Sequence, residues 1–232
     1  MIETTVVKKV LSNLNITTHP KVLLGLASLS LLFLLGLGAP LLAPYDPNLQ
    51  NLSATFSPPS IITGVGQHLL GTDSLGRDIL SRLIYGARTA VFVGTLGAIL
   101  AGLLGTLVGV TAGYVRGRVD EALMRVVDVW MSVPTVVMAV ALITVLGVGI
   151  ENVTLAIIII DWTRFARVIR GQVLTLRERD FVQAAKAIGY GDFTVIFREI
   201  VPNIIHLFIV LFTLEMTIAI NVEVLLTFVG FG

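Results

Sequence analysis

Long uncharged apolar stretches alternate with shorter charged segments along the chain. A membrane helix needs about 20 mostly apolar residues, because about 30 Å of hydrocarbon is crossed at about 1.5 Å per residue. Each stretch of this kind is therefore predicted to be a span, and the third one should bend because it contains Pro134. The four stretches are Val22–Ala43, Thr89–Val115, Val126–Leu146 and Ile204–Val222.

A fifth, weaker candidate is Val153–Ile169. Its apolar run, Leu155–Ile160, is too short to cross a bilayer alone and is followed by charged residues. Helix can continue beyond the membrane face, and Asp161 and Arg164 stand three positions apart, where side chains on a helix can pair. We therefore predict five spans.

The distribution of positive charge tests this count, because cytoplasmic loops of membrane proteins carry an excess of Lys and Arg. With five spans and a cytoplasmic N-terminus, the outer side receives only Arg77, Arg82 and Arg88. The other thirteen of the sixteen basic residues fall on the cytoplasmic side: Lys8, Lys9, Lys21, Arg116, Arg118, Arg125, Arg164, Arg167, Arg170, Arg177, Arg179, Lys186 and Arg198. This asymmetry supports both the orientation and the weak fourth span.

Between the first two spans lies a predicted external loop, 45–88. Its first part is proline-rich and is expected to be irregular. Its second part, Leu75–Ala87, has apolar residues on one helical face and is predicted to be an amphipathic helix at the membrane interface, with Asp78 and Arg82 paired and with Asp73 capping the turn before it.

The composition agrees with an all-α polytopic membrane protein. Hydrophobic residues make up 55% and charged residues 13%, against about 25% charged residues in soluble proteins. The hydrophobicity excludes disorder, the absence of cysteine excludes a disulfide framework or thiolate metal site, and the net charge of +1 does not favour a nucleic-acid partner.

The sequence contains no convincing catalytic or nucleotide-binding motif. Gly71–Asp78 has two glycines five positions apart, but Arg77 and Asp78 stand where a phosphate-binding loop needs Lys and a hydroxyl. There is no zinc-protease motif and there are 3 histidines in all. We therefore predict a chain without catalytic, cofactor-binding or metal-binding residues of its own.

Small residues recur every four positions in the second span, at Ala101, Gly105, Gly109 and Gly113. Such a face lets membrane helices approach closely, so we expect other helices of a bundle to pack against it.

Acidic and polar residues within the spans are candidates for a translocation path, because charges in mid-membrane are costly. Glu215 is the most isolated of them, and Asn221 and Glu223 follow on the same helix. Glu215 could equally be the buried partner of an arginine or a neutral acid. Asp128 is expected to pair with Arg125.

The cytoplasmic segment 171–202 contains a short predicted helix with a shallow apolar face, formed by Phe181, Ala184, Ala185 and Ile188. This face is too small to build a core, so it is suited either to dock in a groove of a partner or to lie as an ordinary surface loop.

Two further residues give this segment its ends. Gly189 is placed to cap the short helix at its C-terminus. Asp192 is placed to cap a second helix, running through Val201 and ending before Pro202.

Several motifs together resemble permeases of ABC importers, and specifically those of the dipeptide/oligopeptide/nickel family. Gln183-Ala184-Ala185, then Gly189, then Val201-Pro202 resemble the EAA loop of these permeases. The other segments that resemble the family are Ala43–Pro47, Gly71–Arg82, Tyr85–Arg88, Ala166–Leu174 and Leu225–Gly232. The resemblance runs from about residue 20 to the last residue.

The resemblance implies a subunit of a prokaryotic inner or plasma membrane that pairs with a second, homologous permease. It also implies two cytoplasmic ATP-binding subunits, which would carry ATP and Mg, and an external substrate-binding protein. The residues then expected to contact an ATPase subunit, or to lead from the contact into the fifth span, are Phe181, Gln183, Ala184, Ala185, Ile188, Gly189, Asp192 and Pro202.

Two features depart from the family pattern. Gln183 stands where the family has glutamate, which removes a charge from the loop. The family also continues beyond a similar ending into a sixth span, so the sequence is expected to be truncated or a shortened relative.

The predicted organisation is a cytoplasmic segment 1–21, a first span 22–44, the external loop 45–88 and a permease core 89–232. The expected function is half of an ATP-driven import path for peptides, with nickel or oligosaccharides as alternative cargo. The alternatives from other classes are a stand-alone secondary transporter or channel that uses Glu215, and a membrane scaffold without transport.

Overall fold

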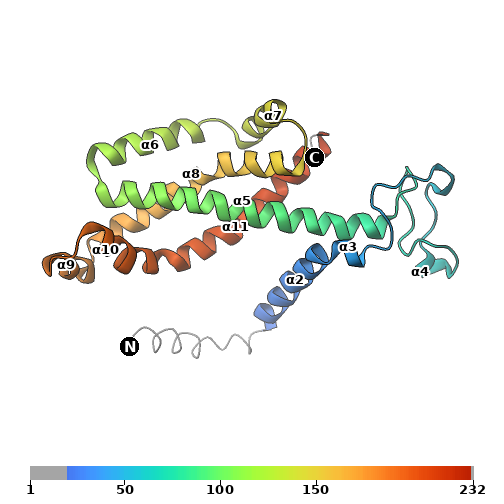
Figure 1. The fold of residues 1–232 in the computed structure, drawn as a ribbon, viewed down its shortest axis with the longest axis horizontal. Coiled ribbons are helices and arrows are strands. Elements are labelled where there is room, and N and C mark those ends of the chain that lie inside the picture. The colour runs from blue at the N-terminus through green and yellow to red at the C-terminus, as the bar shows by residue number, and fades with distance from the viewer. Residues whose placement is uncertain (1–19, 231–232) are drawn as a thin grey trace. The chain divides into compact units, whose positions relative to one another are not determined.

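The computed structural model describes residues 20–230, which are almost entirely helical, as Figure 1 shows. The predicted cytoplasmic segment 1–21 therefore lies almost wholly outside the described residues. The single extended pairing in residues 20–230 is a bridge between Thr72 and Asp78. The helices are α2 (Pro20–Leu37), α3 (Ala39–Leu42), η2 (Leu52–Ala54), α4 (Ser60–Thr63), α5 (Ile79–Val115), α6 (Gly117–Met131), α7 (Thr135–Leu146), α8 (Ile150–Arg177), α9 (Asp180–Ala187), α10 (Asp192–Val195), η3 (Ile196–Ile200) and α11 (Val201–Phe228).

The described residues form two compact units, which are divided between Val91 and Phe92. In the first unit, α2 approaches the start of α5 closely at Gly36, where an added Cβ would lie 3.0 Å from the Cγ2 of Val91. Most residues of α2 are exposed and apolar, as expected for a helix surrounded by lipid.

The irregular part of the first unit is held by polar side chains. Asp73 accepts hydrogen bonds from the backbone N–H groups of Leu75 and Arg77, which makes the predicted turn. Asp78 accepts hydrogen bonds from the backbone N–H and the hydroxyl of Ser81, and its other oxygen lies 2.9 Å from Nδ1 of His68.

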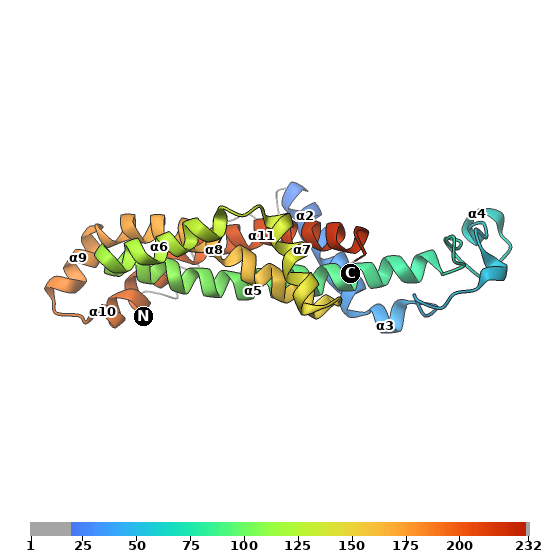
Figure 2. The ribbon, with the colours of Figure 1, turned by 90° about the horizontal axis from the view of Figure 1, so that it is seen from above.

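In the second unit α8 is the central helix, and it packs against α6, α7 and α11 (Figures 1 and 2). Its buried side chains come from all sides of the helix, which is the pattern of a helix enclosed by others. The small face predicted in α5 packs against α8: an added Cβ at Gly109 would lie 2.6 Å from the carbonyl oxygen of Ala166, and one at Gly113 would lie 2.9 Å from the Cβ of Val173. The predicted close approach is confirmed.

Among the described residues, three helical segments are long and apolar enough to cross a membrane: α2, α5, and the run Asp192–Phe228 that α11 ends. The pair α6 and α7 would make a fourth if it counts as one span, although the two helices meet at an angle of 85°. The bend follows from Pro134, which lacks an N–H and disfavours helical backbone at Val133. The bend predicted at Pro134 in the span Val126–Leu146 is therefore present, and it separates two helices.

The amphipathic helix predicted over Leu75–Ala87 is not a separate element. The chain enters helix only at Ile79 and then continues without a break to Val115. Nothing between the two predicted helices interrupts the hydrogen-bonding pattern, since the junction around Thr89 contains neither proline nor glycine.

Two predicted ion pairs are wrong, because each acidic residue finds a partner on another element. Asp128 pairs with Arg167 of α8 at 2.5 Å instead of with Arg125. Asp78 pairs with His68, and Arg82 lies 3.6 Å from Asp73 instead. The predicted pair of Asp161 and Arg164 is present at 3.6 Å.

Candidate functional site

The helix α9 buries one face and exposes the other. Val182 and Ala185 lie on the buried face, three residues apart, so both point to the same side of the helix. They join an apolar core built from the ends of α5, α8 and α11 together with α10 and η3. The other buried members of this core are Val110, Tyr114, Ile169, Val173, Leu176, Val195, Ile200 and Ile204.

The opposite side of α9 and the neighbouring turn expose large apolar side chains. Phe181 is 40%, Ile188 75%, Phe193 77% and Phe197 59% exposed, and Ala184 lies in the same exposed set. We call these five residues the apolar tip. Large exposed apolar side chains gathered on neighbouring elements mark an interaction site or contact with lipid.

The prediction that Ala185 shares one face with Phe181, Ala184 and Ile188 is wrong. Ala185 is only 6% exposed and faces the core, whereas Ala184 is exposed. The core approaches α9 from the side of Val182, and Ala185 follows Val182 by nearly one turn. The sequence alone did not reveal the direction of this approach.

Tyr114, at the end of α5, connects the elements that carry the apolar tip. Its hydroxyl donates a hydrogen bond to Oδ1 of Asp192 at 2.6 Å. Arg177 donates a hydrogen bond to the carbonyl oxygen of Tyr114, and its guanidinium carbon lies 5.5 Å from the centre of the tyrosine ring. Nζ of Lys186 lies 4.7 Å from the same ring centre, within the range of a cation–π interaction. The last turn of α5 is thereby joined to α8, α9 and α10.

Gly189 ends α9 as predicted. Its φ of +96° lies in the region that glycine tolerates and side-chain-bearing residues rarely adopt. The turn returns the chain through hydrogen bonds from Gly189 N–H to Lys186 O and from Tyr190 N–H to Ala185 O. This direction change places Phe193 and Phe197 on the same exposed tip as α9.

The structure gives three other predicted site residues surroundings that differ in part from the predictions. Gln183 is exposed and donates a hydrogen bond from Nε2 to the carbonyl oxygen of Arg177 at 2.9 Å. Asp192 does not cap its helix: Gly191 occupies the N-cap position and Asp192 binds Tyr114. Pro202 is the second residue of α11 and directly follows the π-helical turn η3.

The prediction that the second cytoplasmic helix ends before Pro202 is wrong. Helical backbone runs from α10 through the π-helical turn η3 directly into α11. The apolar tip is therefore joined to the last long helix without an intervening loop.

Glu215 is not open to solvent, because it is 1% exposed and forms an ion pair with Arg164 of α8 at 2.9 Å. Asp161, 2% exposed, lies 3.6 Å from the same guanidinium. This contact agrees with the alternative in which Glu215 is the buried partner of an arginine.

The other two path candidates form no cluster with Glu215. Asn221 is exposed and donates a hydrogen bond to the carbonyl oxygen of Thr217. Glu223 is half-buried and accepts a hydrogen bond from Thr227. Both contacts stay within α11.

Tyr114, Arg177 and Arg164 were not predicted as site residues. For Tyr114 the sequence did contain a signal, since it is a polar aromatic residue at the end of an apolar span, two positions before the charged segment that starts at Arg116. Arg164 could not be matched to Glu215 because fifty-one positions separate them.

Comparisons with known proteins agree with this architecture. Residues 105–232 match the family described as "Binding-protein-dependent transport system inner membrane component". Residues 17–59 match the "N-terminal TM domain of oligopeptide transport permease C".

Curated relatives give the same picture. The chain is 36% identical over 208 residues to the dipeptide transport system permease protein DppC of Bacillus subtilis, covering 90% of this chain and 63% of the relative. It is 36% identical over 210 residues to the oligopeptide transport system permease protein OppC of Bacillus subtilis, covering 90% of this chain and 67% of that relative. It is also 37% identical over 209 residues to the di/tripeptide transport system permease protein DppC of Pseudomonas aeruginosa, covering 90% and 69%.

The chain thus spans roughly two thirds of the length of the curated relatives that it matches. The family match covers more than half of the chain and includes α8, α9, the apolar tip and α11. This chain belongs to the family of inner-membrane components of binding-protein-dependent transport systems.

Proposed function

We propose that the chain is a permease subunit of an ATP-driven peptide importer, in which the apolar tip docks on a cytoplasmic ATPase subunit. The observation that carries this proposal is an exposed apolar surface on a rigidly held element, in a chain of a family of transport components. The names of the relatives concern dipeptides, oligopeptides and di/tripeptides, which favours peptides over nickel or oligosaccharides as cargo.

The construction of the tip suits the transmission of force. Tyr114 and Arg177 connect the tip to α5 and α8, and η3 continues into α11 without a loop. A displacement of α9 by a partner would therefore act on three long helices together. Coupling to ATP also requires that the tip contact the ATPase differently in its two states.

We propose five spans with a cytoplasmic N-terminus. Within this arrangement α8 is a span although it carries charges, because three of its arginines pair with acidic residues of neighbouring helices: Arg164 with Glu215, Arg167 with Asp128 and Arg170 with Asp120. The excess of basic residues on one side supports the orientation.

We propose that a second permease subunit and an external binding protein complete the importer. ATP and Mg would be bound by the ATPase subunits, and the role of this chain is then structural and mechanical. A stand-alone carrier using Glu215 is less well supported, because the chain belongs to a family of components of binding-protein-dependent transport systems.

The test is ATPase activity of the reconstituted importer, stimulated by peptide-loaded binding protein. Ile188→Asp places a charge on the apolar tip and should abolish most of the stimulation and reduce co-purification of the ATPase at least tenfold. Ile62→Asp is the matched control, since Ile62 is 80% exposed on the other unit. Unchanged stimulation in Ile188→Asp would contradict the docking role.

A further inference from the structure

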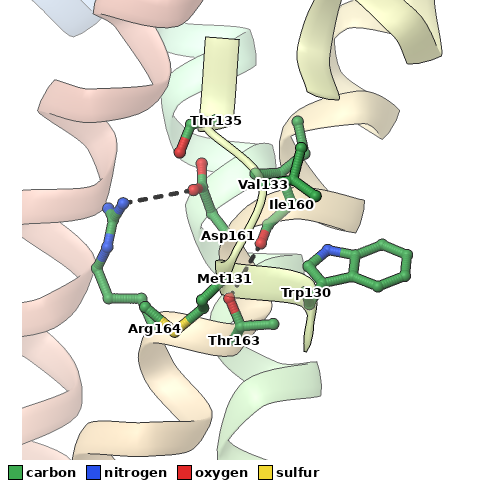
Figure 3. A pocket seen from close by; sticks show the side chains of 8 residues that line it. All are labelled: Trp130, Met131, Val133, Thr135, Ile160, Asp161, Thr163 and Arg164. Carbon is green, nitrogen blue, oxygen red and sulfur yellow. Dashed lines mark hydrogen bonds and ion pairs between the residues drawn. The ribbon is translucent and has the colours of Figure 1, made fainter. Parts of the chain in front are cut away.

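A cavity lies where the α6–α7 pair is broken, beside the central helix α8 (Figure 3). Its volume is about 60 Å³, enough for a small polar head group or one to two waters. From α8 it is lined by Asp161 and Arg164, which Figure 3 shows joined on one side. The remaining lining residues are Trp130, Met131, Val133, Thr135, Ile160 and Thr163.

The cavity contains a buried acceptor without a donor. The side chain of Asp161 is 3% exposed, and its Oδ2 has no hydrogen-bond partner in the described residues. Oε1 of Glu215 is also buried and also has no hydrogen-bond partner in the described residues. Leaving a buried polar atom unsatisfied costs about 1–3 kcal/mol, and more for a charged group, so a donor that fills this place would be strongly held.

The charges around the cavity are also unbalanced. Two carboxylates, Asp161 and Glu215, share one guanidinium, that of Arg164, with nitrogen–oxygen distances of 3.6 and 2.9 Å. The two carboxyl groups also lie within hydrogen-bonding reach of each other, and with both ionised the cluster carries one negative charge in excess. Within a bilayer such an excess favours a compensating cation.

We propose that this cavity binds a primary ammonium group, namely the N-terminal ammonium of a peptide on its way through the permease. This inference rests on the proposed function for the class of cargo. An ammonium supplies three N–H donors and one positive charge, and the cluster lacks a donor and one positive charge.

The other walls of the cavity fit the same group. The hydroxyl of Thr163 donates to the carbonyl oxygen of Ile160, which leaves its lone pairs free to accept. Trp130 uses its N–H for the carbonyl oxygen of Ile159, so its contribution to the cavity is the ring, which attracts cations. Met131 and Val133 complete this wall with apolar side chains.

The two tryptophans of the chain provide the readout. Trp130 lines the cavity, and the ring of Trp162 lies 6.5 Å from it. The full chain, purified in lipid nanodiscs, is titrated with Ala-Ala, with N-acetyl-Ala-Ala and with NaCl while tryptophan fluorescence is recorded. Ala-Ala should give a saturable change, and N-acetyl-Ala-Ala should bind at least tenfold more weakly, because it lacks the ammonium.

Variants locate the site. Asp161→Asn should weaken binding of Ala-Ala at least tenfold, whereas Asp128→Asn should leave it unchanged, because Asp128 is 56% exposed and lies outside the lining of the cavity. The comparison of the two peptides on the unmodified chain needs no variant and decides the question even if Asp161→Asn fails to fold.

Three results would overturn the proposal: no saturable response to Ala-Ala, equal binding of the two peptides, or a response saturated equally by NaCl. None of these results would contradict the proposed function, which is tested separately by ATPase co-purification and ATP-driven uptake. Conversely, loss of ATPase coupling would leave ammonium binding to the isolated chain measurable.

Discussion

The loop of the first unit and the α9–α10 region of the second unit are both non-spanning segments, yet they are built by opposite means. The loop is held by its own polar groups: Asp73 and Asp78 together accept six hydrogen bonds or ion-paired contacts within residues 68–81. The α9–α10 region has few such bonds and depends on apolar burial against the ends of long helices.

This difference has a mechanical consequence. A loop that satisfies its own polar groups keeps its shape when neighbouring helices move. A segment whose core is shared with α5, α8 and α11 must move with those helices. The loop of the first unit is therefore suited to be a fixed surface, and the α9–α10 region is suited to transmit movement. For this reason the proposed coupling element is the α9–α10 region.

The largest expected effect comes from Val182→Asp. Val182 is fully buried in the shared core, so the variant places an unpaired charge there, at a cost of about 3–5 kcal/mol. We expect α9 to detach and to become sensitive to limited proteolysis, while the loop 45–78 stays resistant. Ala184→Asp, on the exposed side of the same helix, should leave the protease resistance unchanged.

The second-largest expected effect is a destabilisation of the loop of the first unit. Asp78→Asn keeps the shape of the side chain but removes the charge that accepts from Ser81 and pairs with His68, at a cost of about 2–3 kcal/mol. Proteolysis should then cut the loop and spare α9. Asp46→Asn is the control, because Asp46 is exposed and accepts a hydrogen bond from the N–H of Asn48. Equal sensitivity of both regions in Asp78→Asn would disprove their independence.

A smaller effect is expected from backbone strain in the α9–α10 turn. Gly189→Ala puts a side chain at φ +96° and should cost about 1–2 kcal/mol, although no atom lies within 4 Å of the new Cβ. Gly191→Ala is a matched control with equally open space but φ −66°. Thermal unfolding should separate the two variants by several degrees, and equal stability would show that the turn is not held in this conformation.

The smallest effect is that of acid on the loop of the first unit. Burial alone would raise the pKa of Asp78, but hydrogen bonds from Ser81 and His68 outweigh it and lower the pKa below 3.8. The stabilisation is thus present above pH 3.8 and is lost as the pH falls through the lowered pKa. Loop proteolysis with an acid-stable protease should rise below about pH 4, and Asp78→Asn should remove this dependence.

The sequence predicted those features that depend on local pattern. The helical class, the turn at Gly189 and the close packing of α5 at Gly109 each follow from residue type and spacing, and the structure confirms them. The 85° break after Met131 was only predicted as a bend, because the effect of one proline depends on what supports the freed backbone.

Contacts between distant elements could not be predicted. The partner of Glu215, Arg164, and the partner of Asp128, Arg167, depend on how each helix is rotated about its own axis. The same uncertainty misplaced Ala185 on the exposed face of α9. A hydrophobic pattern shows that a face exists, but a small alanine face does not show which side the core approaches from.

The most direct test of the account is the side of the membrane on which the apolar tip lies. The chain has no cysteine, so Ile188→Cys and Ile62→Cys each introduce a single reactive thiol at residues that are 75% and 80% exposed. A membrane-impermeant maleimide should label Ile62→Cys in intact cells and Ile188→Cys only in inverted vesicles, where a bound ATPase subunit should protect it. Labelling of Ile188→Cys from outside intact cells would contradict the coupling role of the tip.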